Sequence, residues 1–163
     1  MTTVIILLLG ENMKTICFVC TGNICRSAMA HHYLQKKLYD AKKENDIIVS
    51  SCGTNAYTGD KITDFACKAI AKYGVDASSH RATNIHDSDI LKSDLILCMT
   101  KNHKKNVLEI YPSLEGKVYT LKEYVGHDDS YDDIDDPWGY GVEVYNSCAG
   151  EIVKYLDKLV DML

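Results

Sequence analysis

The chain has 163 residues, of which 46% are apolar, and this is enough for one globular domain with its own core. Its formal net charge of −5 disfavours a nucleic-acid partner, since nucleic-acid-binding proteins usually carry a basic face. The seven cysteines are odd in number and lack framework spacing, which disfavours a disulfide scaffold. A reducing, cytoplasmic location is therefore expected.

The first apolar segment, Val4–Leu9, is six residues long and too short to span a bilayer. No Lys or Arg precedes it, as a secretory signal would require, so no membrane partner is expected. We expect residues 1–12 to be a non-native or disordered extension before a natural start at Met13, with an extra strand or hydrophobic arm as the alternative. Residues 13–163 would then form a single domain. Sequencing the N-terminus of the native protein tests this expectation, and recovery of residues 1–12 contradicts it.

Strands and helices are expected to alternate along the rest of the chain. Short apolar runs predict strands at residues 15–19, 47–49, 95–99 and 118–121. Apolar residues at helical spacing predict helices at residues 27–43, 62–73, 100–111 and 142–163, and a short helix between 86 and 91. This alternation predicts an α/β fold with a parallel sheet and helices on both faces. Ligands in such folds bind at the carboxyl ends of the strands.

One loop, Cys20–Arg26, lies between the first predicted strand and the first predicted helix. A strand, a tight loop and a helix start together form a phosphate cradle, because their N–H groups converge on one point. This loop also has a thiol at its first position and an arginine six residues later. The thiol can act as a nucleophile and the guanidinium can grip two phosphate oxygens. The combination favours phosphoryl transfer to cysteine over nucleotide binding.

An acidic segment, His127–Asp136, holds six aspartates in ten residues. Most of them are interpreted as part of a solvated loop or a weak cation site. Asp136 differs because Pro137 follows it and restricts it to an extended or turn conformation. Trp138 then supplies an aromatic wall beside the carboxylate.

The segment Cys20–Ser27, together with the distant Asp136-Pro137-Trp138, resembles the low-molecular-weight protein tyrosine phosphatase family. Two further segments, Val49–Thr54 and Ser79–Arg81, are similar to family segments, and the resemblance extends from Met13 to Leu163. It implies a three-layer α/β fold, with a four-stranded parallel sheet of flavodoxin-like topology. It also implies a protein substrate, no metal and no organic cofactor.

The resemblance assigns chemical roles to three residues. Cys20 would be the nucleophile, held as a thiolate by loop N–H groups, the helix N-terminus and Arg26. Arg26 would bind two phosphate oxygens and stabilise the transition state. Asp136 would protonate the leaving phenolate and then activate water, and its position before proline favours it over Asp135. The phosphate-binding loop itself would consist of Cys20, Thr21, Gly22, Asn23, Ile24, Cys25 and Arg26.

Supporting roles are expected for four neighbours of these residues. Ser27 would cap the first helix and hydrogen-bond the Cys20 thiolate. Asn23 suits a left-handed loop position, and in the family it ties the loop to polar groups that match Ser51 and His80 here. His80 is expected to be structural.

Cys25 lies five residues after the nucleophile. The resemblance supports a reversible disulfide with Cys20 under oxidation, which would protect the nucleophile. The alternative is a small side chain that only packs in the loop.

The substrate is inferred from the side chains that would line the pocket. Several segments resemble the protein arginine phosphatase branch of the family, whose members have threonine at the position of Ile24. Ile24 offers no hydrogen bond and suits the face of a phenyl ring, and Tyr57 and Trp138 would form two aromatic walls. We therefore expect a phosphotyrosine-containing protein as substrate, with protein arginine phosphatase as the alternative.

Two other functions use the same loop. A related arsenate reductase also needs a pair of downstream redox cysteines, and Cys98 has no close partner in the sequence. A non-catalytic phosphopeptide-binding module would lack the nucleophile or the acid, whereas both Cys20 and Asp136 are present. Both alternatives are disfavoured. The sequence gives no indication of the oligomeric state.

Overall fold

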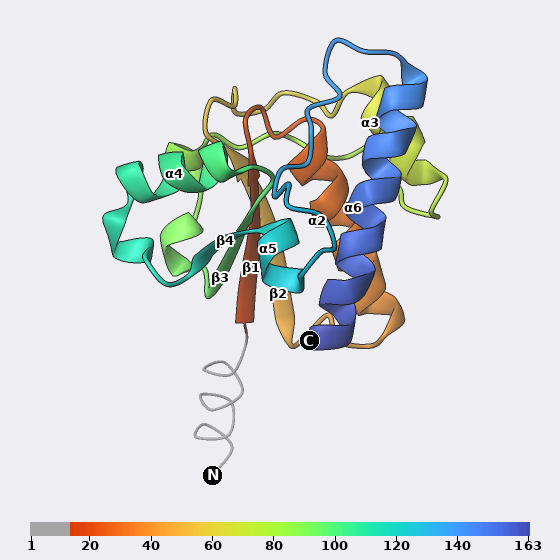
Figure 1. Ribbon diagram of the computed structural model, residues 1–163. Coiled ribbons are helices and arrows are strands. Elements are labelled where there is room, and N and C mark those ends of the chain that lie inside the picture. Colours follow the sequence, from red (N-terminus) through yellow and green to blue (C-terminus); the bar gives the residue numbers. More distant parts are fainter. Residues whose placement is uncertain (1–13) are drawn as a thin grey trace.

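The computed structural model describes residues 14–163, so the expected extension at residues 1–12 and the expected start at Met13 lie outside the described residues. Four parallel strands form one sheet in the order β2-β1-β3-β4 (Figure 1). Their bounds are Lys14–Cys20 for β1, Ile47–Gly53 for β2, Leu95–Cys98 for β3 and Val118–Thr120 for β4. The predicted four-stranded parallel sheet is confirmed.

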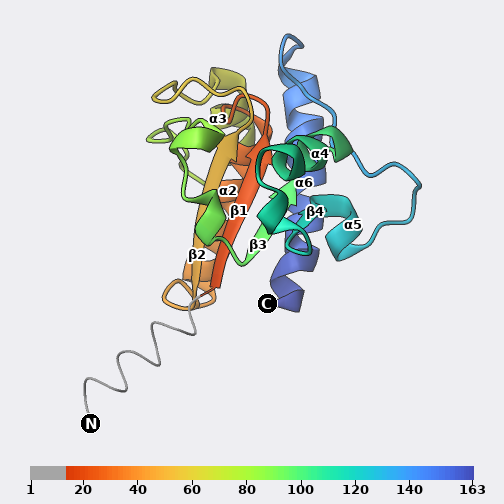
Figure 2. The same cartoon turned by 90° about the vertical axis from the view of Figure 1, so that its left-hand side faces the viewer.

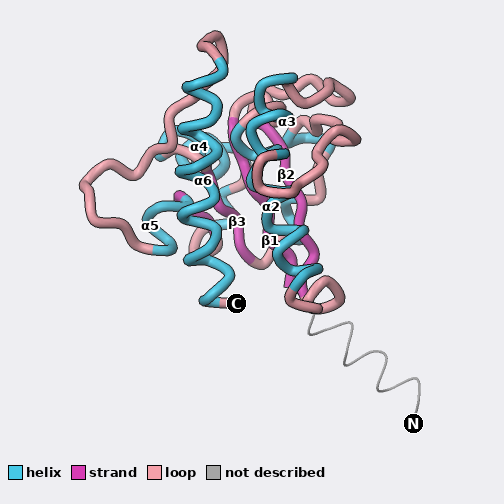
Figure 3. The backbone as a smooth tube through the Cα atoms, turned by 90° about the vertical axis from the view of Figure 1, so that its right-hand side faces the viewer, coloured by secondary structure: helices cyan, strands magenta, loops and turns pink. Residues whose placement is uncertain are grey.

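Helices cover both faces of the sheet. Helices α2, α3 and α6 lie on one side and α4 on the other, as the two side views also show (Figures 2 and 3). Their bounds are Arg26–Asp40 for α2, Asp64–Ala71 for α3, Lys101–Ile110 for α4, Leu121–Val125 for α5 and Val142–Met162 for α6. Within residues 14–163, no helix is both long enough and apolar enough to cross a bilayer.

Strand β1 supplies both halves of the core because its side chains alternate between the faces of the sheet. Ile16 and Phe18 pack into the cluster under α2, α3 and α6. Cys17 and Val19 pack into the smaller cluster that contains Val107 of α4. Cys20 belongs to the first cluster, so the two cysteines of β1 project from opposite faces.

Three local features differ from the sequence-based expectations. The short helix expected between residues 86 and 91 is a pair of 3-10 turns, Ile85–Asp87 and Ile90–Lys92. Helix α3 begins only at Asp64, because the Thr63 hydroxyl accepts a hydrogen bond from a backbone N–H of its first turn. Helix α5 was not predicted, since five residues are too few to show helical periodicity.

The carboxyl ends of β1 and β2 meet beneath the predicted phosphate-binding loop. Cys20 and Gly53 are partners in the register of these strands. A Cβ atom on Gly53 would lie 2.4 Å from the carbonyl oxygen of Thr21 and 3.0 Å from the amide nitrogen of Asn23. Both neighbours are backbone atoms that cannot rotate away. The loop can therefore rest on this strand end only because residue 53 has no side chain.

We expect Gly53→Ala to destabilise the protein by about 1–3 kcal/mol, because the added methyl forces the loop backbone to shift. The displaced loop should also lose phosphate affinity, measured as weaker competitive inhibition by inorganic phosphate. Gly141→Ala is the matched control, since a Cβ there meets no atom within 4 Å. Unchanged thermal stability and phosphate affinity in Gly53→Ala would contradict the role given to Gly53 beneath the loop.

Candidate active site

A cavity of about 370 Å³ opens at the carboxyl end of β1. It contains most of the predicted site residues, from the loop after β1 and from the segment before α6. Two of its residues, Asn55 and Asp60, were not predicted. The lining consists of Cys20, Thr21, Gly22, Ile24, Cys25, Arg26, Asn55, Tyr57, Asp60, Asp136 and Trp138.

The thiol of Cys20 is buried and receives two hydrogen bonds. The backbone N–H of Asn23 donates to its Sγ at 3.3 Å, and the Ser27 hydroxyl lies 2.8 Å from the same sulfur. The side-chain amide of Asn23 donates to Ser27 Oγ at 2.8 Å. Ser27 already accepts that bond, so its own proton is directed to the sulfur. Two hydrogen-bond donors therefore point at the sulfur of Cys20.

Ser27 does not cap the first helix, and this part of the prediction is wrong. Helix α2 begins at Arg26, with Cys25 at the N-cap position and no capping hydrogen bond from a side chain. The Ser27 hydroxyl is engaged with the thiol of Cys20 and the amide of Asn23 instead. Of the two roles expected for this hydroxyl, the geometry provides the contact with the Cys20 thiol.

Asn23 is fully buried and adopts the left-handed conformation that was predicted, with φ of 55°. Its side-chain oxygen accepts a hydrogen bond from the Thr83 N–H at 2.9 Å. Its carbonyl accepts one from Nε2 of His80 at 2.7 Å. His80 therefore lies where it was expected, as a support behind the loop. Thr83 was not predicted, because it contributes its backbone N–H, a group that every residue except proline carries.

Ser51 does not contact Asn23, contrary to the expectation from the family pattern. Its hydroxyl is hydrogen-bonded to Nδ1 of His31 at 2.7 Å. Ser51 lies in β2 opposite Phe18, two residues before the strand end that supports the loop. The hydroxyl of Ser51 is therefore engaged by the histidine of α2 and not by the loop.

Arg26 joins the loop to the acidic segment, although more than 100 residues separate them. Its side chain is only 5% exposed. Nη1 donates to the carbonyl of Ile134 at 2.8 Å, and Nη2 lies 3.4 Å from a carboxylate oxygen of Asp136. The backbone of Ile134 is itself bonded to the Met99 carbonyl at 2.8 Å, just beyond β3. The guanidinium is thereby held at the cavity with its position fixed.

Asp136 lines the cavity, whereas its neighbour Asp135 does not. One Asp136 oxygen accepts the Trp138 N–H at 3.1 Å, a turn favoured by the intervening proline. Asp135 accepts a hydrogen bond from the Tyr131 hydroxyl at 2.5 Å and lines a separate surface hollow. Only Asp136 of this pair is placed to reach a group bound beside Cys20.

Cys25 lies in the cavity wall with a buried thiol. Its Sγ is 3.5 Å from the Thr63 hydroxyl and 3.5 Å from the Tyr145 hydroxyl. Burial raises the pKa of this thiol above its ordinary value. The thiol is therefore protonated at neutral pH.

His103 is a neighbour of the loop that was missed in the sequence. Its Nε2 is 2.8 Å from the Thr21 hydroxyl, and the ring is buried beneath the loop. Burial lowers the pKa of His103 to about 4, so the ring is neutral at physiological pH. Helix α4 presents this side chain from its first turn. A single histidine in a helix gives no signal of such a contact before the fold is known.

Residues 15–163 match the family described as low molecular weight phosphotyrosine protein phosphatase. The chain belongs to this family. A member of this family is a hydrolase of phosphoric monoesters that acts on proteins, and the predicted family, fold and enzyme class are confirmed.

Relatives of this phosphatase include enzymes named for two substrates. The protein-arginine-phosphatase of Geobacillus stearothermophilus is 34% identical over 148 residues, which cover 91% of this chain and 95% of the relative. The low molecular weight protein-tyrosine-phosphatase PtpB of Staphylococcus epidermidis is 36% identical over 148 residues, which cover 90% of this chain and 96% of PtpB. The crystal structure of a low molecular weight protein tyrosine phosphatase from T. tengcongensis matches this chain with a TM-score of 0.84 and 36% sequence identity. The match covers 92% of this chain and 99% of that protein's chain.

Proposed function

We propose that this phosphatase hydrolyses phosphotyrosine in protein substrates through a phosphocysteine intermediate on Cys20. The observation that carries the proposal is one cavity that holds the thiol, the guanidinium of Arg26 and the carboxylate of Asp136. These are the nucleophile, the phosphate ligand and the proton donor that the reaction needs. The family match over residues 15–163 supports a single phosphatase domain at 13–163. A cytoplasmic location is supported by its seven free thiols.

In the first step the Cys20 thiolate attacks phosphorus, so that an S–P bond forms while the P–O bond to tyrosine breaks. Arg26 and the loop N–H groups stabilise the charge on the equatorial phosphate oxygens. Asp136 gives its proton to the departing phenolate oxygen.

In the second step water attacks the phosphocysteine, forming a new P–O bond while the S–P bond breaks. The Asp136 carboxylate takes a proton from the attacking water, and inorganic phosphate leaves. The electron pair of the broken bond returns to the Cys20 sulfur. The Ser27 hydroxyl, 2.8 Å away, stabilises the thiolate that forms.

The side chains around the cavity support an aromatic substrate. Ile24 gives the pocket an apolar, branched surface next to the phosphate cradle. Tyr57 and Trp138 are 79% and 64% exposed, which is unusual for large aromatic side chains. Both side chains line the cavity and can pack against a tyrosine ring.

Phosphoarginine is a second candidate substrate because of Asp60. This acidic side chain lines the cavity and could pair with a guanidinium group, which a phenyl ring does not offer. The similarity to a protein-arginine-phosphatase supports the same candidate. We place phosphotyrosine first, since Ile24 cannot hydrogen-bond the phosphoguanidinium and threonine stands at this position in the arginine-specific branch.

Arsenate reduction would require a further redox cysteine near the cavity, and the position of Cys98 does not fit this role. Cys98 is buried in the core at the end of β3 and does not line the cavity. Burial raises the pKa of this thiol well above its ordinary value, so it is a poor nucleophile.

We further propose that Cys25 is the redox partner of the nucleophile. Peroxide would oxidise the Cys20 thiolate to a sulfenic acid, and the Cys25 thiolate would then attack that sulfur and expel hydroxide. The resulting disulfide returns to two thiols when an added dithiol reduces it. The position of both thiols on one cavity wall supports this reaction.

The proposed role of Asp136 as a general acid is tested by comparing two esters whose leaving groups differ in their need for a proton. For Asp136→Asn, kcat/KM should fall by about 10²–10⁴ with phenyl phosphate and much less with p-nitrophenyl phosphate, whose leaving group needs little protonation. Cys20→Ser should lose at least about a thousandfold with both esters. Asp135→Asn is the matched control and should retain wild-type activity. Equal losses with the two esters in Asp136→Asn would exclude the acid role, and unchanged activity in Cys20→Ser would exclude the mechanism.

Substrate choice is tested with phosphotyrosine and phosphoarginine peptides of the same sequence. Wild type should prefer phosphotyrosine, and Ile24→Thr should shift the ratio of kcat/KM values toward phosphoarginine by about tenfold. Asp60→Asn should reduce only the phosphoarginine reaction. The control Ile48→Thr changes an exposed isoleucine of β2 that lies outside the cavity. A wild-type preference for phosphoarginine would overturn the assignment.

The role of Cys25 is tested by recovery from peroxide. After exposure to peroxide long enough to carry an unprotected sulfenic acid on to sulfinic acid, wild type should regain most of its activity with dithiothreitol. Cys25→Ser should remain inactive, because a dithiol does not reduce a sulfinic acid. Because the pKa of Cys25 is raised, its thiolate fraction grows with pH, and recovery should improve from pH 6.5 to 8.5. Cys67→Ser is the control, a half-buried cysteine of α3. Full recovery of Cys25→Ser would contradict the proposal.

A further inference from the structure

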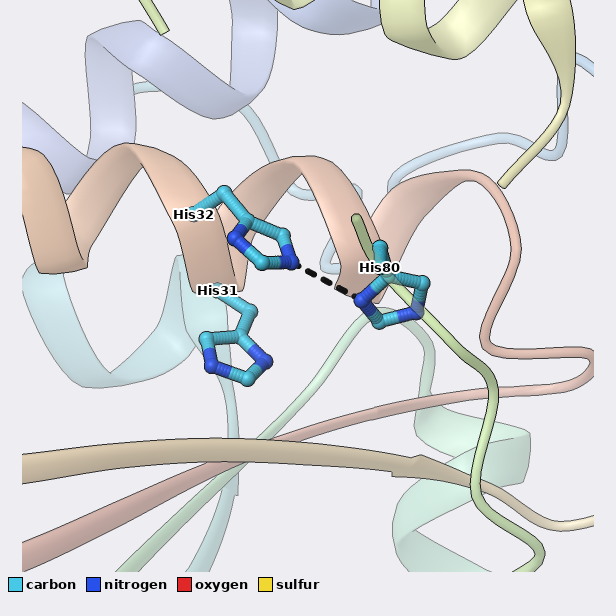
Figure 4. Close-up of side chains that lie close together, drawn as sticks. All are labelled: His31, His32 and His80. Atoms are coloured by element: carbon cyan, nitrogen blue, oxygen red, sulfur yellow. Dashed lines mark hydrogen bonds between the residues drawn. The ribbon is translucent and has the colours of Figure 1, made fainter. Parts of the chain in front are cut away.

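Three histidines form a cluster that contacts the phosphate-binding loop outside the catalytic cavity. His31 and His32 are consecutive residues of α2, and His80 lies in the segment between α3 and the first 3-10 turn (Figure 4). None of the three lines the cavity that holds Cys20. The mechanism proposed above uses no proton or ligand bond from this cluster.

The three rings face one another closely. One nitrogen from each ring lies within 4.8 Å of the other two, and Nε2 of His32 is 2.9 Å from Nδ1 of His80. The rings of His31 and His32 stack at 4.5 Å with an interplanar angle of 8°. Consecutive residues of a helix normally diverge by about 100°, so both side chains have turned toward a common point.

The hydrogen bonds of His80 and His32 define where these two rings carry their protons, while Nδ1 of His31 already contacts the Ser51 hydroxyl at 2.7 Å. Nε2 of His80 contacts the carbonyl of Asn23, which can only accept, so this nitrogen carries the proton. Nδ1 of His80 is then an acceptor and His32 donates to it. Burial is the main cause that lowers the pKa of all three histidines, to about 3 for His31 and about 4 for His32. All three imidazoles are therefore neutral, the form that binds metal ions.

We propose that His31, His32 and His80 bind one divalent first-row cation of borderline softness, with Zn²⁺ as the reference ion. Three imidazoles suit such ions, and tetrahedral Zn–N bonds of 2.0–2.1 Å place ligand nitrogens about 3.3 Å apart. The observed separations, from 2.9 Å up to 4.8 Å, need only small side-chain rotations to reach this value. The proton on Nε2 of His32 moves to its other nitrogen, which points away from His80 (Figure 4).

The surroundings fit a bound cation. A surface hollow of about 440 Å³, lined by His32 and Asp76 among others, gives access from solvent. The Asp76 carboxylate favours positive charge at His32, which partly offsets the effect of burial on its pKa. Lys36 also lines the hollow, but its ammonium group is paired with Asp40 at 3.0 Å. A water molecule from the hollow can complete the coordination.

The site would connect directly to the phosphate-binding loop. A metal-bound histidine usually donates its second N–H to a carbonyl or carboxylate, which fixes the ring. His80 already makes this bond, to the carbonyl of Asn23 at 2.7 Å. A cation on His80 would thus hold the loop from behind through a single shared side chain.

The test is titration of Zn²⁺ into the full chain carrying Cys20→Ser, which removes the active-site thiol as a competing ligand. Calorimetry should show one Zn²⁺ per chain, and the melting temperature should rise with Zn²⁺ because the ion binds the folded state. Adding His32→Gln or His31→Gln should weaken binding at least about tenfold and abolish the thermal shift. Circular dichroism and the melting temperature without metal verify that each variant folds.

Two histidines outside the cluster serve as controls. His86→Gln changes an exposed ring, and His127→Gln removes the ring that lies between Asp129 and Asp132, where a separate cation site is conceivable. Both should bind Zn²⁺ like the parent protein. The proposal is overturned if no saturable binding is found, if His31→Gln and His32→Gln both bind normally, or if His127→Gln alone abolishes binding.

Discussion

Asn23 holds the phosphate-binding loop in its working shape, and the rest of the site depends on it. Its backbone N–H and side-chain amide donate to Cys20 and Ser27, while its two oxygens accept from Thr83 and His80. A buried polar group left without a hydrogen-bond partner lowers the stability of the fold by about 1–3 kcal/mol. Breaking one of these bonds would therefore destabilise the loop. The direction of the Ser27 proton toward the Cys20 sulfur is a consequence of this arrangement.

The sheet supplies the fixed surface on which the loop rests. Parallel strands bring the ends of β1 and β2 to one edge, and Gly53 allows the two backbones to approach. The same edge anchors the acidic segment, because Ile134 is bonded to the residue after β3 and to the side chain of Arg26. Asp136 follows Ile134 by two residues and is thereby placed beside the loop.

The sequence was sufficient to predict those features of this enzyme that depend on neighbouring residues in the chain. Continuous apolar runs indicated the strands, and the residue types of the loop indicated phosphate chemistry before any geometry was known. The partners that depend on tertiary packing could not be predicted in this way. Thr83 acts through its backbone, His103 reaches the loop from another helix, and Ser51 bonds to His31 instead of Asn23. Ser27 has a local preference for capping a helix, but its hydroxyl bonds to the Cys20 thiol instead.

The contact of 3.4 Å between Arg26 and Asp136 means that the guanidinium has a carboxylate neighbour before any phosphate arrives. A phosphate dianion must take over that neighbour's place, and it carries more negative charge than the carboxylate it displaces. Binding therefore exchanges one anionic partner of Arg26 for another, and the lost contact with Asp136 offsets part of the attraction between the guanidinium and the phosphate.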